Sequence, residues 1–259
     1  MTAESALSGL RIGPVSYLNT KPLIWGIDRA ILAPDVPSAL ARKFYGGELD
    51  AALLPVFEVL RAGGGLLVDD VAIACDGEVY SVIVASRSDF PDCGAIHLDP
   101  ASRSSAALLR VLLAEFFPGG PVVTEATEIP ADGARLLIGD AAMQFRAQAG
   151  KGWQYHDLGG LWKACTGLPF VFAVWAVSER TGAAAAIFDA FRTLKAGGLL
   201  ARKEIAAAEA DPDFAFRYLT QWIRYDLGGP EKRALRLYET LCRRHGLLPP
   251  GEPADLQFR

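Results

Sequence analysis

Small polar side chains follow a predicted strand and precede a predicted helix at several points of the chain. At the first junction, a short strand over 11–15 runs into Ser16, Tyr17, Asn19 and Thr20. A helix is predicted to begin near Thr20, with Asn19 or Thr20 as its N-cap. Free backbone N–H groups and the positive end of a helix dipole attract an anion. The junction therefore predicts an anion cradle, although one such junction alone is also typical of ordinary helix capping.

The second polar junction, residues 98–105, carries a denser group of hydroxyls. Ser102, Arg103, Ser104 and Ser105 lead into a helix predicted over 105–117. One hydroxyl is sufficient for a cap, and a guanidinium is suited to a carboxylate. The pattern favours an anion site, and the alternative is a capping box beside a surface arginine.

Two more strand-to-helix junctions and one isolated hydroxyl complete the set. A strand over 50–54 meets a helix at Pro55, and a strand over 135–138 meets one at Asp140, predicted as the N-cap. Ser81 is the single small hydroxyl in the apolar strand predicted over 79–85. A buried serine bonded to the backbone is the ordinary interpretation of such a residue, and a ligand contact is the alternative.

Composition excludes several classes of partner. The 259 residues carry a net charge of −4 without basic clusters, which argues against nucleic acid. The longest apolar run, 168–177, is far shorter than the ~20 residues that cross a bilayer, so no membrane partner is expected. Residues 1–9 lack the basic and apolar regions of a secretory leader, and the predicted location is the cytoplasm.

The cysteines and histidines give no sign of a metal or of a disulfide framework. They are widely spaced and form no pairs at metal-ligand distance in the sequence: Cys75, Cys93, Cys165, Cys242, His97, His156 and His245. The phosphate-binding loops, zinc motifs and nucleophile elbows of common enzyme classes are also missing from the sequence. We therefore do not expect a metal enzyme, a nucleotide-dependent enzyme or a catalytic-triad enzyme.

The last third of the chain is predicted to be entirely helical. Helices are expected over 183–196, 202–210, 213–225 and 231–244, with the first one ended by Gly197 and Gly198. Aromatic residues recur at helical spacing in the third of these helices. They are interpreted as a stripe that faces the core rather than as a cofactor site: Phe214, Tyr218, Trp222 and Tyr225.

Short strands that alternate with helices predict an α/β protein with mainly parallel sheets. Two uninterrupted apolar strands, 79–85 and 170–177, bracket a block that reads as an inserted second lobe. Lobe 1 is then 1–84 with 174–259, lobe 2 is 85–173, and the two strands are the crossovers. Ligands bind beyond the carboxyl ends of strands in open α/β sheets. The junctions are therefore expected to face one another across a cleft, with Ser81 on its floor.

Several segments resemble the chorismate dehydratases of the futalosine route to menaquinone, in the same order as in that family. They cover much of residues 10–177: GPVSYLNTKPL (13–23), GELDAALLP (47–55), LDPASRSS (98–105), LIGD (137–140) and TGLPFVFAVWA (166–176). One departure is Ser104, where the family pattern has threonine, and the hydroxyl is retained.

The resemblance implies a two-lobed fold of the type II periplasmic-binding-protein kind, here with a helical C-terminal region. It also implies a cofactor-free lyase that converts chorismate to 3-[(1-carboxyvinyl)oxy]benzoate and water. The matching positions make Asn19 and Ser81 the catalytic residues, which act by orienting hydrogen bonds. Substrate-binding residues are then found at the junctions: Ser16, Tyr17, Thr20, Ser102, Arg103, Ser104, Ser105 and Asp140. The substrate's own enolpyruvyl carboxylate is the hypothetical proton acceptor.

Two other functions remain open from the sequence. A solute-binding protein for a small carboxylate is the commonest use of this fold, but the missing secretory leader argues against it. The sister enzyme of the same route, which forms dihydroxynaphthoate on a similar fold, fits the opening motif at 15–20 less well.

Overall fold

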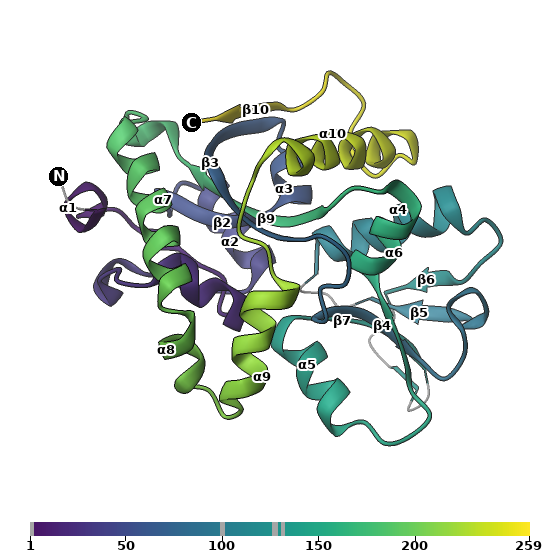
Figure 1. Ribbon diagram of the computed structural model, residues 1–259. Helices are drawn as coiled ribbons and strands as arrows, with labels where there is room; N and C mark the ends of the chain where they lie inside the picture. Colours follow the sequence, from purple (N-terminus) through teal and green to yellow (C-terminus); the bar gives the residue numbers. More distant parts are fainter. Residues whose placement is uncertain (1–2, 99–101, 126–128, 131–132) are drawn as a thin grey trace.

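The chain folds around two five-stranded sheets (Figure 1). This computed structural model describes residues 3–98, 102–125, 129–130 and 133–259. Position 99, the predicted end of one strand, and positions 100–101 of the second polar junction lie outside the described residues.

The first sheet combines strands from both ends of the chain. Its spatial order is β1 (Ile12–Gly13), β2 (Ala51–Pro55), β9 (Phe170–Val177), β3 (Gly64–Cys75) and β10 (Asp255–Phe258). Every residue of β9 is buried, as its unbroken apolar sequence predicts for a strand covered on both faces. Its place in the middle of the sheet, between β2 and β3, accounts for that burial.

The second sheet is built only from the middle of the chain. Its spatial order is β6 (Val122–Thr124), β5 (Ala95–His97), β7 (Ala134–Ile138), β4 (Val82–Ser86) and β8 (Gln154–Asp157). Strand β4 is likewise buried along its whole length, because β7 and β8 flank it.

The expectation of mainly parallel sheets is wrong. Strand β9 runs antiparallel to β2 and β3, and β4 runs antiparallel to β7 and β8. The remaining pairs, β1 with β2, β10 with β3, and β5 with β6 and β7, are parallel. Hydrophobic patterning reports burial but not strand direction, so these two central strands read the same in either orientation.

Helices cover both sheets. Their bounds are α1 (Ala3–Leu7), η1 (Leu18–Ile24), η2 (Arg29–Ile31), α2 (Pro37–Tyr45), α3 (Val56–Arg61), η3 (Phe90–Asp92), α4 (Ser104–Phe116), α5 (Gly139–Gln148), α6 (Leu158–Thr166), η4 (Glu179–Thr181), α7 (Ala185–Leu200), α8 (Arg202–Ala207), α9 (Pro212–Arg217), η5 (Tyr218–Trp222) and α10 (Gly229–Arg244). The elements η1 to η4 are 3₁₀ helices, and η5 is a π-helical turn.

Gly197 and Gly198 do not end a helix, contrary to the prediction. Both lie inside α7, which packs against η1. A Cβ atom at Gly198 would lie 1.7 Å from the carbonyl oxygen of Pro22 in η1. Glycine is therefore required at Gly198 because two backbones meet there, which a single sequence does not distinguish from a helix stop.

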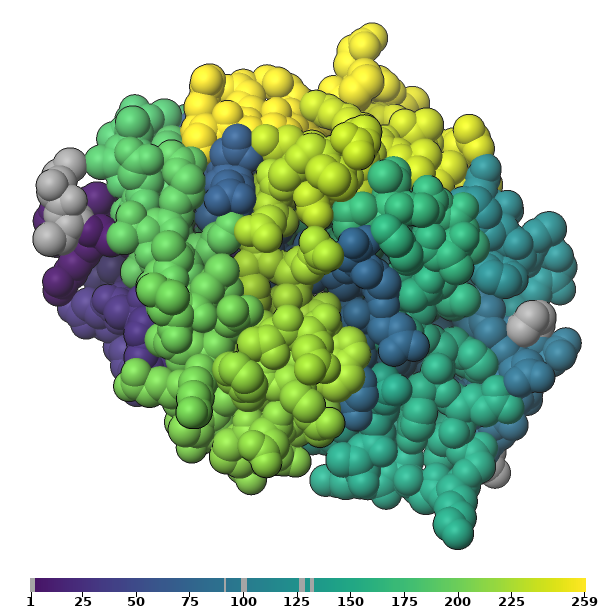
Figure 2. Space-filling model, in the orientation of Figure 1, coloured from purple at the N-terminus to yellow at the C-terminus, as the bar shows by residue number. Residues whose placement is uncertain are grey.

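The C-terminal region departs from an all-helical tail in two places. Strand β10 joins the edge of the first sheet beside β3, and the predicted helix over 213–225 is divided into α9 and the π-helical η5. In Figure 2 the C-terminal residues, green to yellow, cover much of the visible face and lie against teal residues of the middle block.

The prediction that the strands at 79–85 and 170–177 cross between the two sheets is wrong. Strand β4 belongs wholly to the second sheet and β9 wholly to the first. The chain passes between them at 76–81 and again through α6 and 167–169. The division at 84/85 and 173/174 stays a prediction. The described helices include none long and apolar enough to cross a membrane.

Candidate functional site

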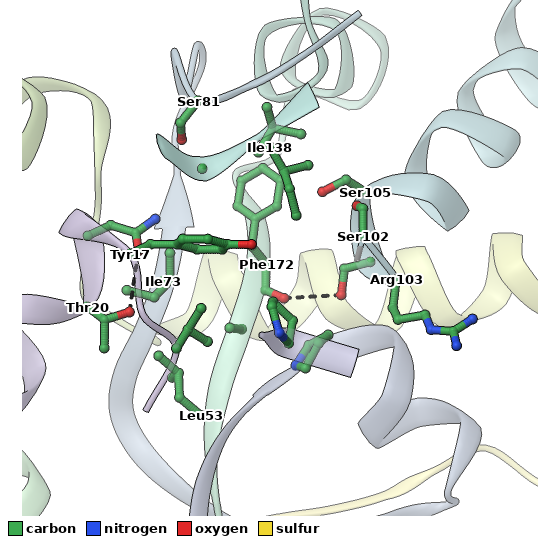
Figure 3. A pocket seen from close by; sticks show the side chains of 18 of the residues that line it. Tyr17, Thr20, Leu53, Ile73, Ser81, Ser102, Arg103, Ser105, Ile138 and Phe172 are labelled. Carbon is green, nitrogen blue, oxygen red and sulfur yellow. Dashed lines mark hydrogen bonds between the residues drawn. The ribbon is translucent and has the colours of Figure 1, made fainter. Parts of the chain in front are cut away.

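A pocket lies where the two sheets face each other, and all of the predicted junctions contribute to its wall (Figure 3). The space between the lining atoms, counted together with the open mouth, amounts to about 610 Å³. Its walls are mostly apolar with a few polar groups: Val15, Tyr17, Asn19, Thr20, Pro37, Leu53, Pro55, Ile73, Val79, Ser81, Val82, Ser102, Arg103, Ser104, Ser105, Ile138, Gly139, Phe172 and Ala173.

Asn19 reaches the pocket from η1, and it is not a helix cap. Tyr17 occupies the N-cap position without a capping hydrogen bond, and the element is a 3₁₀ helix that contains Pro22. The predicted capping role of Asn19 or Thr20 is therefore wrong. Thr20 is buried, and its hydroxyl donates to Asn19 Oδ1 at 3.4 Å. The Asn19 Nδ2 group has a different partner.

Asn19 and Ser81 are joined by a third residue, Tyr218. The Asn19 Nδ2 group donates to the Tyr218 hydroxyl oxygen at 3.2 Å, and that hydroxyl donates to Ser81 Oγ at 2.7 Å. Tyr218 is fully buried. Burial raises the pKa of Tyr218 far above its ordinary value, so the phenol is protonated and remains a donor at neutral pH.

The backbone that carries Ser81 is held in an unusual conformation. Tyr80, directly before it, has a φ of 68°, which is rare for a residue with a side chain. Asp157 accepts hydrogen bonds from the N–H groups of Val79 and Tyr80, and the Arg146 guanidinium lies 3.8 Å from the centre of the Tyr80 ring. Burial raises the pKa of Asp157, although the hydrogen bonds that its carboxylate accepts from backbone N–H groups lower this pKa. These contacts fix the direction in which Ser81 enters the pocket.

Tyr17 and Gly139 bring the two sheets' residues together at one side of the pocket. Gly139 has a φ of 57°, and a Cβ atom there would lie 3.0 Å from the Tyr17 ring. The aromatic ring therefore packs directly on the backbone at the start of α5. Tyr17 thereby becomes part of the wall, as Figure 3 shows.

The start of α4 has no capping hydrogen bond from its own N-cap side chain. Arg103 occupies this N-cap position. Among the described residues, the buried hydroxyl of Ser102 has no hydrogen-bond partner. Ser104 Oγ donates to the Phe172 carbonyl at 3.1 Å and accepts from the Phe57 N–H at 3.2 Å, so it fastens α4 to the first sheet. Ser102 thus offers a buried hydroxyl without a partner among the described residues, next to the N–H groups that begin α4.

Arg103 lies at the edge of the pocket rather than inside it. Its side chain is 54% exposed, and its Nε lies 3.6 Å from Oε1 of the buried Glu58. Arg61 shares the same carboxylate through a 2.5 Å contact to Oε2. In Figure 3 the Arg103 guanidinium points away from the Tyr17 ring. Its predicted role in binding a carboxylate stays a prediction.

Two other predicted binding residues are not in the pocket wall. Ser16 is exposed. Asp140 is half-buried within the first turn of α5, where Ile138 has the N-cap position, so the predicted capping role is wrong. Its Oδ1 instead accepts the Leu18 N–H at 3.3 Å, which links α5 to η1. Burial raises the pKa of Asp140, and the Leu18 hydrogen bond lowers it less.

The site contains one residue whose role the sequence analysis missed. Tyr218 belongs to the aromatic stripe, and its ring does stack on Phe214, with 6.2 Å between centroids. Its hydroxyl, however, faces Asn19 and Ser81. No local pattern reveals this, because Tyr218 follows Asn19 by 199 residues. Among the described residues, no cluster of three or more His, Cys, Asp or Glu is arranged to hold a metal ion.

Comparison with known proteins identifies the family of this chain. A model of a family described as menaquinone biosynthesis matches residues 10–244. The chain belongs to this family. It is 31% identical to a chorismate dehydratase of Thermus thermophilus, a match that covers 88% of this chain and 93% of the relative. A chorismate dehydratase of Campylobacter jejuni is 26% identical, with 89% and 96% covered.

Solved structures of the same fold are more distant in sequence. An Archaeoglobus fulgidus protein aligns with a TM-score of 0.66 at 17% identity and covers 92% of this chain and 98% of its own. The ligand-binding component of an ABC-type import system from Staphylococcus aureus aligns with a TM-score of 0.64 at 13% identity, covering 96% and 95%. The predicted periplasmic-binding-protein-like fold is confirmed, and at these identities the likeness concerns the fold alone.

Proposed function

We propose that this protein is a chorismate dehydratase, a lyase that needs no cofactor and converts chorismate to 3-[(1-carboxyvinyl)oxy]benzoate and water. The supporting observation is the pocket between the two sheets, whose wall combines Asn19 and Ser81 with the residues at the start of α4. Chorismate dehydratases are among the relatives that match almost the whole chain.

The start of α4 is suited to one carboxylate of the dianionic substrate. Its first N–H groups and the helix dipole favour negative charge, and Ser102 supplies a hydroxyl that is otherwise unpartnered among the described residues. Arg103 adds positive charge at the rim. The apolar walls lower the local dielectric and so strengthen each of these interactions.

Asn19 and Ser81 then hold the ring and its departing hydroxyl. The reaction removes the proton at ring C3 and breaks the C4–O bond, and the C3 proton and the departing hydroxide account for the released water. The electrons left at C3 complete an aromatic ring, which supplies the driving force. Neither an amide nor a serine hydroxyl is a base in its ordinary state, so both residues serve as hydrogen-bonding partners.

The proton acceptor in this proposal is the substrate's own enolpyruvyl carboxylate. Among the described residues that line the pocket, none carries a carboxylate, an imidazole, an amine or a thiol. Because residues 99–101 lie outside the description, Asp99→Asn provides the direct test. The variant is expected to keep kcat within about threefold of wild type, and a loss of 10²-fold would assign the base to Asp99 instead.

The test of the function is to incubate the purified protein with chorismate and to follow chorismate and its product by mass spectrometry. We expect a product lighter by one water, formed at the same rate with and without EDTA. Chorismate that binds in calorimetry without losing water would indicate a solute-binding protein. Turnover of a cyclic futalosine derivative in its place would indicate the sister dihydroxynaphthoate-forming enzyme.

We also propose that the inserted block, near residues 85–173, acts as the second lobe and that the enzyme works in the cytoplasm. The support for the lobe is the second sheet. Strands β5, β6, β7 and β8 lie within this block, and β4 begins three residues before it, at Val82. Cell fractionation followed by the chorismate assay tests the location.

A further inference from the structure

The Tyr218 hydroxyl has hydrogen-bond partners on both sides, and both partners are pocket residues. It accepts from the Asn19 amide and donates to Ser81 Oγ, at 3.2 and 2.7 Å. Tyr218 itself does not line the pocket. Its hydroxyl therefore acts on a bound ligand through the two side chains to which it is hydrogen-bonded.

The direction of these hydrogen bonds determines what Ser81 offers to a ligand. A tyrosine hydroxyl has one proton, and here that proton is given to Ser81 Oγ. Ser81 is thereby an acceptor toward Tyr218, and among the described residues no acceptor receives the Ser81 proton. Because Ser81 lines the pocket, that proton is available to a group bound there (Figure 3).

The Tyr218 hydroxyl also fixes the orientation of the Asn19 amide. An amide at this position could present either its oxygen or its nitrogen to Tyr218. The Tyr218 proton is already committed to Ser81, so the phenol oxygen is left as an acceptor and selects the Asn19 NH₂ group. Thr20 reinforces this orientation by donating to the amide oxygen.

Tyr218 is also held rigidly enough to impose these directions. It begins the π-helical turn η5, a local geometry that is rare and often found at functional sites. The ring is fully buried and stacked on Phe214. The hydroxyl therefore has little freedom to turn away from its two partners.

We propose that Tyr218 is a positioning residue of the dehydration, one that sets Ser81 as a hydrogen-bond donor toward the departing hydroxyl and fixes the Asn19 amide beside the ring. This inference rests on the proposed function. Tyr218 does not act as a proton source, because loss of its proton would leave a buried phenolate. The burial of the ring, which raises the pKa of Tyr218, opposes that outcome.

The test is Tyr218→Phe, which removes the hydroxyl and keeps the ring. We expect kcat to fall about tenfold to a hundredfold, because Ser81 and Asn19 lose the partner that orients them. KM should change less than about threefold, since the start of α4 still binds the carboxylate.

A matched control is available in Tyr225→Phe. Tyr225 is equally buried and lies in the same C-terminal region, and its hydroxyl has no partner among the described residues. This variant is expected to retain the wild-type kcat. A double variant, Ser81→Ala with Tyr218→Phe, separates positioning from structure. If Tyr218 acts largely through Ser81, the factor by which Tyr218→Phe lowers kcat should be at least threefold smaller in the Ser81→Ala background than in the wild-type background.

Provided that the wild-type protein dehydrates chorismate, three results would overturn the inference. They are a wild-type kcat in Tyr218→Phe, an equal loss in Tyr225→Phe, and a full multiplicative loss when Tyr218→Phe is added to a protein that already carries both Asn19→Ala and Ser81→Ala. Failure of the wild-type protein itself to dehydrate chorismate would instead refute the proposed function, so the two failures are distinguishable.

Discussion

Replacing Gly198 by alanine should damage the site from outside it. A Cβ atom at Gly198 would lie 1.7 Å from the Pro22 carbonyl oxygen, and ordinary contact begins near 3.4 Å. Helix α7 and η1 must therefore separate by about 1.7 Å at this point. Asn19 lies three residues before Pro22 in the same 3₁₀ helix, so the displacement is passed directly to the pocket.

The expected loss follows from that displacement. A misplacement of about 1 Å in a catalytic group can lower the rate about 10²-fold, and we expect Gly198→Ala to reduce kcat by at least that factor. Overpacking costs about 1–3 kcal/mol of unfolding free energy, and the better helix propensity of alanine returns about 1 kcal/mol. Stability should therefore fall only slightly, by up to about 2 kcal/mol.

Gly197→Ala is the matched control on the same helix. A Cβ atom there meets no atom within 4 Å, so this variant should gain up to about 1 kcal/mol of stability and keep full activity. Chorismate turnover and urea unfolding of both variants give the answer. Wild-type kcat in Gly198→Ala, or equal damage in Gly197→Ala, would refute the inferred close contact between the two backbones.

Three further predictions concern the pocket, its rim and the contact between α5 and η1. Asn19→Ala and Ser81→Ala should each lower kcat about 10²-fold in the chorismate assay, and full turnover by both would remove them from the mechanism. Arg103→Ala should weaken chorismate binding about tenfold in calorimetry, because its guanidinium is half-exposed and already paired with Glu58; an unchanged affinity would make it a surface residue. The pKa of Asp140 is raised above its ordinary 3.8, chiefly by burial, so the folded state holds this proton longer than the unfolded state. Its contribution to stability should then decline as pH rises from about 4 through the folded pKa, and melting curves of wild type and Asp140→Asn should diverge over that range; parallel curves would contradict this.

Burial and the positions of the junctions could be predicted from the sequence, because both are local patterns. The unbroken apolar run of β9 predicts a fully buried strand, and every residue of that strand is buried. The junctions at Asn19 and at Ser102 do meet in one pocket. Strand direction was not predictable in this way, since apolar side chains pack equally well in parallel and antiparallel neighbours.

The errors concern residues whose partners are distant in the chain. The sequence around Gly198 predicts a helix stop, because the partner of this glycine, the Pro22 backbone, belongs to another element. The sequence around Asn19 predicts a cap, because its partner Tyr218 lies 199 residues away. Tyr218 itself fits the core-facing interpretation for its ring, and only the hydroxyl departs from it. Periodicity describes a face of a helix but not the single polar atom at the end of a side chain.

The late position of Tyr218 in the chain has a consequence for synthesis. Chains are made from the N-terminus, so Asn19 and Ser81 leave the ribosome well before the hydroxyl that joins them. A nascent chain stopped before residue 218 would contain both of these residues and the serines of α4, yet neither side chain would have its orienting partner. The enzyme is thus expected to become active only after residue 218 has been synthesised and α9 and η5 have docked.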